Sequence, residues 1–533
     1  MSNLELLDCT LRDGGYVNDW EFGHDTMTSI LERLVSSKVD IIEVGFLDDR
    51  RPFDINRSIM PDTASVKKIY GNIAKGSAMI VGMIDYGTCS IDNIEPCKES
   101  YLDGIRVIFK KHVMHEAIDF CRQIKNLGYK VFTQAVSITS YNDEELIELI
   151  KLVNELEPYA LSMVDTYGLL HQGSLSHIFD ILNANLNPDI SIGYHAHNNF
   201  QMGYANCIEI LNKKVERTIL VDATLYGMGK SAGNAPIELI SMYMNENFGK
   251  KYDVNQMLEA IEINIMDIHN KVYWGYNLFY YISASNKCHP NYVSYLMNKR
   301  TLSIKSINEI LKTIEEDKKL LYSKEHIEEL YLKYQQNECS DGVAINALDE
   351  IFKNKEVLVI GPGKNITLEL EKIKKYIIDV DPIVIAINYI PNEFKPNYLF
   401  ITNSKRYAQM ATKLSDDENK VLKTIATSNV TKTNGSFSYV LNYSSLIDAE
   451  TEIPDNSLIM LLKTLEKAEV KKVALAGFDG YSASEMNYFN TNMEYSFAKE
   501  KADYLNNYAT TFVCDYKKRI NLEFVTSSYY EVK

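Results

Sequence analysis

The chain has 533 residues, 46% of them hydrophobic and 24% charged, which excludes extensive disorder and, at this length, a single compact core. Its formal net charge of −16 at pH 7, without a long basic run, argues against a nucleic-acid partner. No apolar run approaches the roughly 20 residues that cross a bilayer, the first residues do not resemble a signal peptide, and the eight cysteines form no C-x-x-C pair, so we expect a cytoplasmic protein with reduced thiols and no membrane partner.

Short apolar segments alternate with amphipathic helical stretches from the start of the chain to about residue 300. Eight strands separated by helices within about 220 residues are typical of a (β/α)8 TIM barrel. An open doubly wound sheet is the alternative, but it would place a glycine-rich phosphate turn after the first strand, which this sequence lacks. We therefore predict a TIM barrel over residues 1–300, with strands at Leu4–Asp8, Val39–Val44, Ala78–Ile84, Gly104–Phe109, Lys130–Ala135, Ala160–Val164, Ser191–Tyr194 and Arg217–Val221.

A charged segment with Leu and Ile at three- and four-residue spacing follows at about 304–336, and it predicts a helical linker over residues 301–345. A second α/β region then begins near Glu356. Its predicted strands, near 356–364, 383–388 and 473–479, end in Gly, Asn and Asp. This pattern suits an open parallel sheet with a ligand crevice at the carboxyl ends of its strands, so we predict a Rossmann-like domain over residues 346–533.

The first predicted strand runs directly into Asp8-Cys-Thr-Leu-Arg-Asp-Gly-Gly15. The active site of a TIM barrel lies at the carboxyl ends of its strands, so we expect Asp8, Arg12 and Asp13 to lie close together there. Burying two acids around an arginine is costly unless the charges find partners. Taken alone, the motif is equally compatible with a structural ion pair and with a functional site.

The seventh predicted strand ends in Gly193-Tyr-His-Ala-His-Asn-Asn199, where the alternation of an extended segment places His195 and His197 on one side. A lone histidine there would more often be a core residue, but two imidazoles and the strand-one aspartate suit a divalent metal. The loop at 225–234 follows the eighth strand; its glycines allow close approach to a ligand, and Asn234 offers a carbonyl oxygen. We predict a metal site on Asp8, His195 and His197, with Asn234 as a further ligand.

Together these three pieces resemble the DRE-TIM metallolyases, a superfamily that includes 4-hydroxy-2-oxovalerate aldolase, 3-hydroxy-3-methylglutaryl-CoA lyase and isopropylmalate synthase. The resemblance covers about residues 3–295 and implies a divalent metal on the predicted ligands, with Mn²⁺ or Mg²⁺ favoured and Co²⁺ or Zn²⁺ compatible. It implies that Arg12 neutralises the developing enolate oxygen and that Asp13 orients nearby groups. It gives Glu43 and Asp165, at other strand ends, supporting roles. The metal would polarise the ketone of a 2-oxo acid, and Arg12 would add a second positive charge there.

Gly14-Gly15 and the segment Trp274–Tyr281 look most like the hydroxy-oxovalerate aldolase branch. In that branch a histidine that handles the proton on the substrate hydroxyl usually stands where this chain has Tyr16. The proton-transfer group therefore stays open between Tyr16, Tyr276, Tyr280 and His289, and core packing is the alternative role for most of these aromatics. The acetyl-CoA-using synthases usually carry Arg-Asp-Gly-Glu-Gln at the first motif, so they fit less well.

The second domain carries Gly361-Pro-Gly363 between a predicted strand and a predicted helix, where free backbone N–H groups can cradle a phosphate; a simple tight turn fits equally well. With Asn388 at the next strand end, the domain resembles nucleotide-binding Rossmann-like domains of sialyltransferase and pyrophosphokinase type, over about residues 350–530. That resemblance implies a nucleotide or nucleotide-sugar ligand, with Gly361, Gly363 and Asn388 as binding residues.

These features predict a metal-dependent aldolase that makes or breaks a carbon–carbon bond beside a 2-oxo acid such as pyruvate, with an aldehyde as second substrate. The domain pairing suggests unusual-sugar or surface-polysaccharide biosynthesis. An acyl-CoA Claisen-type synthase and a non-catalytic nucleotide-binding scaffold are the alternatives, and a homo-oligomer is compatible with the sequence.

Overall fold

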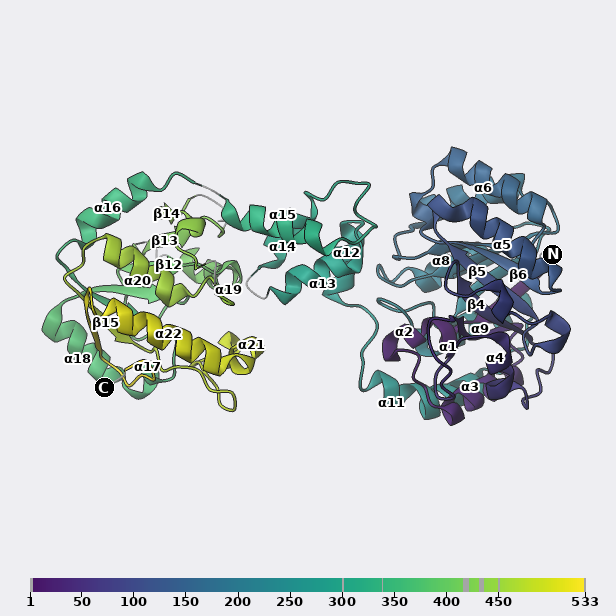
Figure 1. The fold of residues 1–533 in the computed structure, drawn as a ribbon, viewed down its shortest axis with the longest axis horizontal. Helices are drawn as coiled ribbons and strands as arrows, with labels where there is room; N and C mark the ends of the chain where they lie inside the picture. The colour runs from purple at the N-terminus through teal and green to yellow at the C-terminus, as the bar shows by residue number, and fades with distance from the viewer. Residues whose placement is uncertain are drawn as a thin grey trace. The chain divides into compact units, whose positions relative to one another are not determined.

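The computed structural model describes residues 3–299, 302–337, 339–415, 421–430, 436–448 and 451–531. The chain divides into two compact units, Met1–Asn291 and Tyr292–Lys533 (Figure 1). The segment expected as a separate helical linker belongs to the second unit. Among the described residues, no helix combines the length and the apolar character needed to cross a membrane.

The first unit is a closed parallel barrel, which confirms the predicted TIM barrel. Strand β1 pairs with β2 on one side and with β9 on the other, and this double pairing closes the sheet. A ninth, two-residue strand, β3 (Ile59–Met60), extends the sheet beside β2. The barrel strands are β1 (Leu4–Asp8), β2 (Ile41–Leu47), β4 (Met79–Asp85), β5 (Gly104–Phe109), β6 (Lys130–Ala135), β7 (Ala160–Asp165), β8 (Ser191–Ala196) and β9 (Ile219–Ala223).

Helices surround this barrel (Figure 1). Helix α6 is an example of how the sequence forms such a helix. Asn142 and Glu145 form a capping box at its start, and its apolar side, which includes Leu146 and Val153, packs into the main core of the unit. The helices of the unit are α1 (Thr10–Asp13), α2 (Gly15–Asn18), α3 (His24–Ser36), α4 (Thr63–Tyr70), α5 (Met114–Asn126), α6 (Asp143–Leu156), α7 (Gln172–Asn185), α8 (Gly203–Leu211), α9 (Ile237–Phe248), α10 (Val254–Ala260), α11 (Met266–His269) and α12 (Leu278–Ser285), with α13 (Pro290–Asn298) at the junction of the units.

A separate buried apolar cluster, which includes Ile41 and Leu220, lies where β2 and β9 begin. Two residues further along the same strands, on the same side because of the β alternation, come Glu43 and Asp222, which are also buried. The change from apolar to charged side chains therefore occurs along the strands toward their carboxyl ends, which is where a TIM barrel carries its active site.

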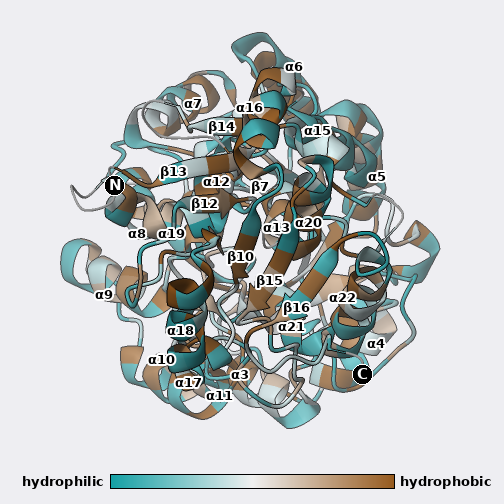
Figure 2. Ribbon diagram, turned by 90° about the vertical axis from the view of Figure 1, so that its left-hand side faces the viewer, coloured by the Kyte–Doolittle hydropathy of each residue, from teal (hydrophilic) through white to brown (hydrophobic). Residues whose placement is uncertain are grey.

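The second unit contains an open sheet in which all seven strands are parallel. Alternate residues of β10 enter two different cores, Val357 and Val359 in one and Leu358 and Ile360 in the other, so helices cover both faces. In Figure 2 the central strands β10 and β15 are predominantly hydrophobic. The strands are β10 (Glu356–Ile360), β11 (Ile383–Ile387), β12 (Tyr398–Ile401), β13 (Lys423–Thr427), β14 (Tyr439–Leu441), β15 (Lys472–Ala476) and β16 (Asn521–Phe524).

The strand order of this sheet is β14-β13-β12-β11-β10-β15-β16. The chain first builds outward from β10 in one direction and then crosses to the other side of β10 to form β15, so the order reverses between these two strands. In open parallel sheets a ligand crevice lies at such a reversal. The helices of the unit are α14 (Ile304–Leu311), α15 (Lys324–Gln336), α16 (Gly342–Phe352), α17 (Asn365–Leu368), α18 (Leu370–Val380), α19 (Ser404–Ser415), α20 (Ser457–Lys467), α21 (Ser496–Glu500) and α22 (Ala502–Tyr516).

Candidate metal centre

Asp13, His195 and His197 come together at the carboxyl ends of β1 and β8. One ligand atom from each of the three side chains lies within 4.8 Å of the others, and all three residues are buried. The two imidazole rings meet edge to face with their centroids 5.0 Å apart. The structure thus brings together one carboxylate and two imidazoles, a donor set that suits a divalent metal.

Asp8, the expected third ligand, does not belong to this cluster. Its carboxylate accepts hydrogen bonds from the backbone N–H of Thr10 at 3.0 Å and from the Thr10 hydroxyl at 2.7 Å. The reason is local: β1 ends at Asp8, and α1 begins two residues later, so this side chain binds the first turn of the helix while Asp13 at the helix end joins the histidines. The cluster in the structure thus contains Asp13 and leaves out Asp8, and we propose Asp13 as its carboxylate ligand.

A buried carboxylate orients His195. The Nδ1 atom of His195 lies 2.9 Å from Asp222 Oδ2, which leaves Nε2 on the side of Asp13, 3.9 Å from its Oδ1. Burial alone would raise the pKa of Asp222, but Arg106 and His195 outweigh burial and lower it. A histidine that binds a metal usually donates its other N–H to such an acceptor.

Two buried polar atoms beside the cluster have no hydrogen-bond partner within the described ranges, His197 Nδ1 and Asn234 Oδ1. Asn234 Nδ2 donates to Asp13 Oδ2 at 2.6 Å, so its amide is fixed against the cluster. Burial lowers the pKa of His197 to about 3, with Asp13 acting in the opposite direction, so the imidazole is neutral at pH 7. Buried polar atoms are rarely left without a hydrogen-bond partner. The unpaired His197 Nδ1 and Asn234 Oδ1 therefore fit a site in which these residues would bind a cation.

Arg12 belongs to an alternating chain of buried charges. It donates to Glu43 at 2.7 Å and to Asp13 at 2.5 Å. Glu43 in turn lies 3.1 Å from Arg106, which also contacts Asp222. This network holds the guanidinium group beside the histidines and supplies the partners that a buried charge requires.

Lys230, in the loop after β9, is a further cationic residue at the site. Its ammonium group lies 5.1 Å from the ring centroid of Tyr16, and its backbone N–H donates to Asp13 Oδ2 at 3.1 Å. Burial lowers the pKa of Lys230, opposed by Asp13. No sequence pattern distinguishes this lysine within its loop, because only folding brings it against the first motif.

The four proton-transfer candidates occupy different surroundings. Desolvation of the hydroxyl, with a further contribution from the charge of Asp13, raises the pKa of Tyr16 to about 12, so Tyr16 keeps its proton at pH 7. Burial, with Lys230 and Lys110, lowers the pKa of His289 to about 4, so its imidazole is neutral. Burial also raises the pKa of Tyr280.

Tyr276 is 57% exposed, and within the described part of the chain no hydrogen bond, ion pair or ring contact joins it to the cluster. Asp165, at the end of β7, accepts hydrogen bonds from the backbone N–H groups of Leu169 at 2.8 Å and Leu170 at 3.0 Å. Burial raises the pKa of Asp165 to about 6, although these two hydrogen bonds act to lower it. Asp165 therefore shapes the loop after its strand, while Tyr276 gains no structural support for a catalytic role.

In the second unit the Gly361-Pro-Gly363 turn has its N–H groups occupied by the protein. Gly361 donates to Ala476 O at 2.9 Å, and Gly363 donates to Gly477 O at 2.8 Å. A Cβ on Gly363 would lie 2.6 Å from Asp479 Oδ1, so glycine is required for this close approach. The expected phosphate cradle at this turn is thus filled by protein groups.

The amide of Asn388, the third expected binding residue, also has protein partners. Its Nδ2 donates to Thr402 Oγ1 at 3.1 Å and to Ser457 Oγ at 2.9 Å, and its Oδ1 accepts from the backbone N–H of Thr402 at 3.0 Å. Asn388 nevertheless lines a cavity beside this sheet edge.

The comparison with known proteins gives one family match, in which the model of the HMGL-like family covers residues 3–265. Similar proteins include the 2-isopropylmalate synthase of Sulfolobus acidocaldarius, with 24% identity over 47% of this chain and 64% of that protein. They also include the 4-hydroxy-2-oxovalerate aldolase of Pseudoalteromonas translucida, with 24% identity over 49% of this chain and 76% of that protein. The oxaloacetate decarboxylase of Mycobacterium tuberculosis has 23% identity over 49% of this chain and 76% of its own length.

All of these matches are distant. This chain spans less than two thirds of the length of the synthase and about three quarters of the lengths of the aldolase and the decarboxylase. The matched family is nevertheless the one that the motif around Arg12 and the histidine pair predict, and the barrel fold agrees with it. The N-terminal unit of this chain is therefore similar to the HMGL-like family, whose model matches residues 3–265.

Proposed function

We propose that the barrel is a divalent-metal-dependent aldolase, which forms or cleaves a carbon–carbon bond beside the carbonyl group of a 2-oxo acid. The observation that carries this proposal is the convergence of Asp13, His195 and His197 within 4.8 Å, next to the buried guanidinium of Arg12. Two of the relatives are named for 2-oxo acids, 4-hydroxy-2-oxovalerate and oxaloacetate, which supports the substrate class.

In this proposal Asp13, His195 and His197 would hold the metal, and Asn234 Oδ1 would be a further ligand, because it is buried without a hydrogen-bond partner in the described part of the chain. The cation, Mn²⁺ or Mg²⁺ in the first place, would supply positive charge to polarise the substrate carbonyl. Asp222 keeps His195 in the tautomer whose Nε2 faces the cluster.

Arg12 stabilises the negative charge that develops on the enolate oxygen. Its guanidinium is only 3% exposed, so the charge acts in a site of low dielectric, and the ion pairs to Glu43 and Asp13 fix its position before reaction. Lys230 provides a second cation at the same site, and we assign it to the carboxylate of the 2-oxo acid.

Cleavage of a 4-hydroxy-2-oxo acid requires removal of the proton from the 4-hydroxyl group. Tyr16 suits the role of proton donor, because a tyrosine hydroxyl carries its proton at pH 7 and Tyr16 lies beside Lys230 at the site. His289 suits the role of acceptor, because its imidazole is neutral at pH 7 and the charges of Lys230 and Lys110 reach it.

The test uses the full chain with a panel of 4-hydroxy-2-oxo acids that differ in the aldehyde they release. We expect pyruvate release that needs Mn²⁺ or Mg²⁺, stops with a chelator and is lost in the Asp13→Asn variant. Parallel reactions with oxaloacetate alone, and with acetyl-CoA plus a 2-oxo acid, test decarboxylation and the Claisen alternative. Bound metal without turnover of any panel member would contradict the aldolase assignment and favour a scaffold role.

A further inference from the structure

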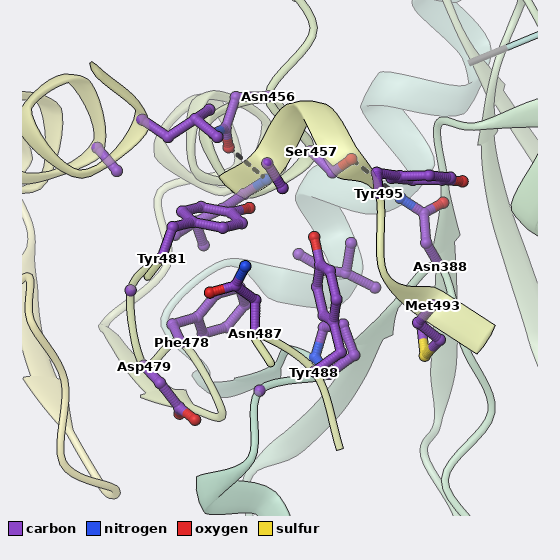
Figure 3. Close-up of a pocket in the computed structure, with 18 of the residues that line it drawn as sticks. Asn388, Asn456, Ser457, Phe478, Asp479, Tyr481, Asn487, Tyr488, Met493 and Tyr495 are labelled. Carbon is purple, nitrogen blue, oxygen red and sulfur yellow. Dashed lines mark hydrogen bonds between the residues drawn. The ribbon is translucent and has the colours of Figure 1, made fainter. Parts of the chain in front are cut away.

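The second unit contains a cavity of about 160 Å³ at the edge of its sheet. The loops after β10 and β15 contribute Gly363 and Phe478 to its wall, so it lies where the strand order reverses. The N-terminal ends of α19 and α20 contribute Arg406 and Ser457. Figure 3 shows Ser457 and Phe478 among the side chains around this space.

Arg406 is a buried cation without an acidic partner. It is 5% exposed, and no carboxylate lies within ion-pair distance of it among the described residues. Its guanidinium donates to the backbone oxygen of Met493 and to Gln409 Oε1 at 3.1 Å, and it packs on the rings of Tyr495 and Tyr488, 4.4 and 5.7 Å from their centroids. The buried arginines of the barrel contrast with it, because Arg12 and Arg106 each pair with two carboxylates.

A buried charge of this kind is costly unless an opposite charge compensates it. Since the described protein groups supply none, the natural counter-ion is a ligand in the cavity that Arg406 lines. The preference for an anion rests on Arg406, because the first turns of α19 and α20 already have side-chain caps, Asn403 and Asn456.

The rest of the wall suits a ring. Tyr481, Tyr488 and Phe478 surround the central space in Figure 3. An apolar cavity of about 150 Å³ takes one benzene ring, so 160 Å³ accommodates about one six-membered ring rather than a dinucleotide. Aromatic faces of this type bind both the C–H face of a sugar and the face of a pyrimidine.

The cavity also has two chemically different sides. Met493, whose backbone oxygen binds Arg406, lies on one side in Figure 3, and Asp479 lies on the other. Asp479 Oδ2 accepts from the backbone N–H of Asn365 at 2.8 Å, while its Oδ1 is buried without a hydrogen-bond partner in the described segments. An anion is therefore favoured at Arg406, and a group with N–H or O–H donors at Asp479.

We propose that this cavity binds the phosphate monoester of a single-ring sugar. The phosphate pairs with Arg406, the ring packs against Tyr481 and Tyr488, and the hydroxyl hydrogens of the ring face Asp479. This places the anion away from the Gly361-Pro-Gly363 turn, whose N–H groups bind the protein. The proposal does not depend on the chemistry of the barrel.

Calorimetry on the full chain tests the proposal with hexose phosphates as probes. Inorganic phosphate and free hexoses are the controls, and a pyrimidine nucleoside 5′-monophosphate, which has two rings, is the size control. We expect at least one hexose phosphate to bind at least tenfold more tightly than its free hexose, than inorganic phosphate and than the nucleotide. Failure of every hexose phosphate to bind the wild-type chain, or tighter binding of the nucleotide, overturns the proposal.

The Arg406→Gln variant should weaken binding of that compound at least tenfold. Lys405→Gln is the matched control, because Lys405 lies next to Arg406 on the same helix but is exposed and does not line the cavity. Arg406→Lys keeps the charge and serves if the glutamine variant unfolds; it should bind more weakly than the wild type, because lysine lacks the guanidinium fork. Unchanged binding in a folded Arg406→Gln variant, or an equal loss in Lys405→Gln, would also overturn the proposal.

Discussion

The Nδ1 atom of His195 lies 2.9 Å from the carboxylate of Asp222, deep in the barrel and beneath the cluster of Asp13 and His197. This contact connects the charged interior of the barrel to the candidate metal centre. It fixes which ring nitrogen of His195 faces Asp13. Asp222 is not itself a proposed metal ligand, but it orients one of them.

The Asp222→Asn variant should therefore weaken metal binding. Loss of the carboxylate partner of a metal-binding histidine typically reduces metal affinity by about 10- to 100-fold. Titration of the metal-free protein with Mn²⁺, followed by electron paramagnetic resonance, measures this change. Asp180→Asn, at an exposed position of α7, is the control and should bind Mn²⁺ as the wild type does. Wild-type affinity in a folded Asp222→Asn variant would remove the assigned role.

The two aspartates of the first motif should behave differently. Asp13→Asn should lose metal binding, because it removes the one carboxylate of the cluster. Asp8→Asn should keep metal binding and mainly affect stability, because Asp8 binds Thr10 instead. Equilibrium dialysis of both variants against Mn²⁺ compares them. Loss of the metal in Asp8→Asn alone would restore the ligand set expected from the sequence.

Asp8 should also make the stability of the metal-free protein depend on pH. Burial, with smaller contributions from Glu43 and Asp222, raises the pKa of Asp8 from 3.8 to about 7. The unfolded chain thus releases this proton at lower pH than the folded chain does, so the contribution of Asp8 to the free energy of unfolding falls as pH rises from about 4 to about 7. Urea unfolding across this range should show the fall in the wild type and a smaller fall in Asp8→Asn. Parallel curves for the two proteins would contradict the assignment.

Lys230→Gln should impair substrate binding more than metal binding. A hydrogen bond to a charged group contributes about 1.5 to 3 kcal/mol, so we expect KM for the 2-oxo acid to rise about 10- to 100-fold. The affinity for Mn²⁺ should change little, because Lys230 is a cation and not a ligand. Steady-state kinetics with the exposed-lysine variant Lys214→Gln as control separates this effect from a general loss of charge. A fall in kcat with unchanged KM would contradict binding of the substrate carboxylate.

The pH profile should identify the proton acceptor. If His289 accepts the proton, kcat/KM should fall on the acidic side with a pKa of about 4, well below that of an ordinary histidine at about 6.5. His289→Asn should lower kcat by about 10²- to 10⁴-fold, the usual size of a general-base contribution, without loss of the metal. Tyr16→Phe should lower kcat without moving the acidic limb. An acidic limb that persists unchanged in His289→Asn would exclude this histidine.

Much of the barrel and part of its site could be predicted from the sequence. The eight apolar segments and their helical spacing predicted the barrel, and the two-residue alternation from His195 to His197 predicted their proximity, because both depend on local periodicity. The choice between Asp8 and Asp13 depends on how the chain turns from β1 into α1, which the pattern of residue types does not encode. Arg106, Asp222 and Lys230 were missed for a related reason: they reach the site only through pairing of distant strands and loops.

The second domain was less predictable. Its apolar strand segments indicated a parallel sheet, but the glycine turn that suggested a phosphate site is closed by Asp479 and Gly477, more than a hundred residues later in the chain. No sequence pattern distinguishes Arg406, because its lack of an acidic partner among the described residues is apparent only in the folded structure. A nucleotide-sugar ligand, which the resemblance of this domain implies, and a role in polysaccharide synthesis, which the domain pairing suggests, stay predictions.

The most direct test of the metal centre is the anomalous diffraction of crystals soaked with Mn²⁺ and oxalate, a mimic of the pyruvate enolate. We predict one strong peak bonded to Asp13, His195 and His197, with oxalate on the side of Arg12. A peak bonded to Asp8 instead, or no peak at the carboxyl ends of β1 and β8, would contradict the account.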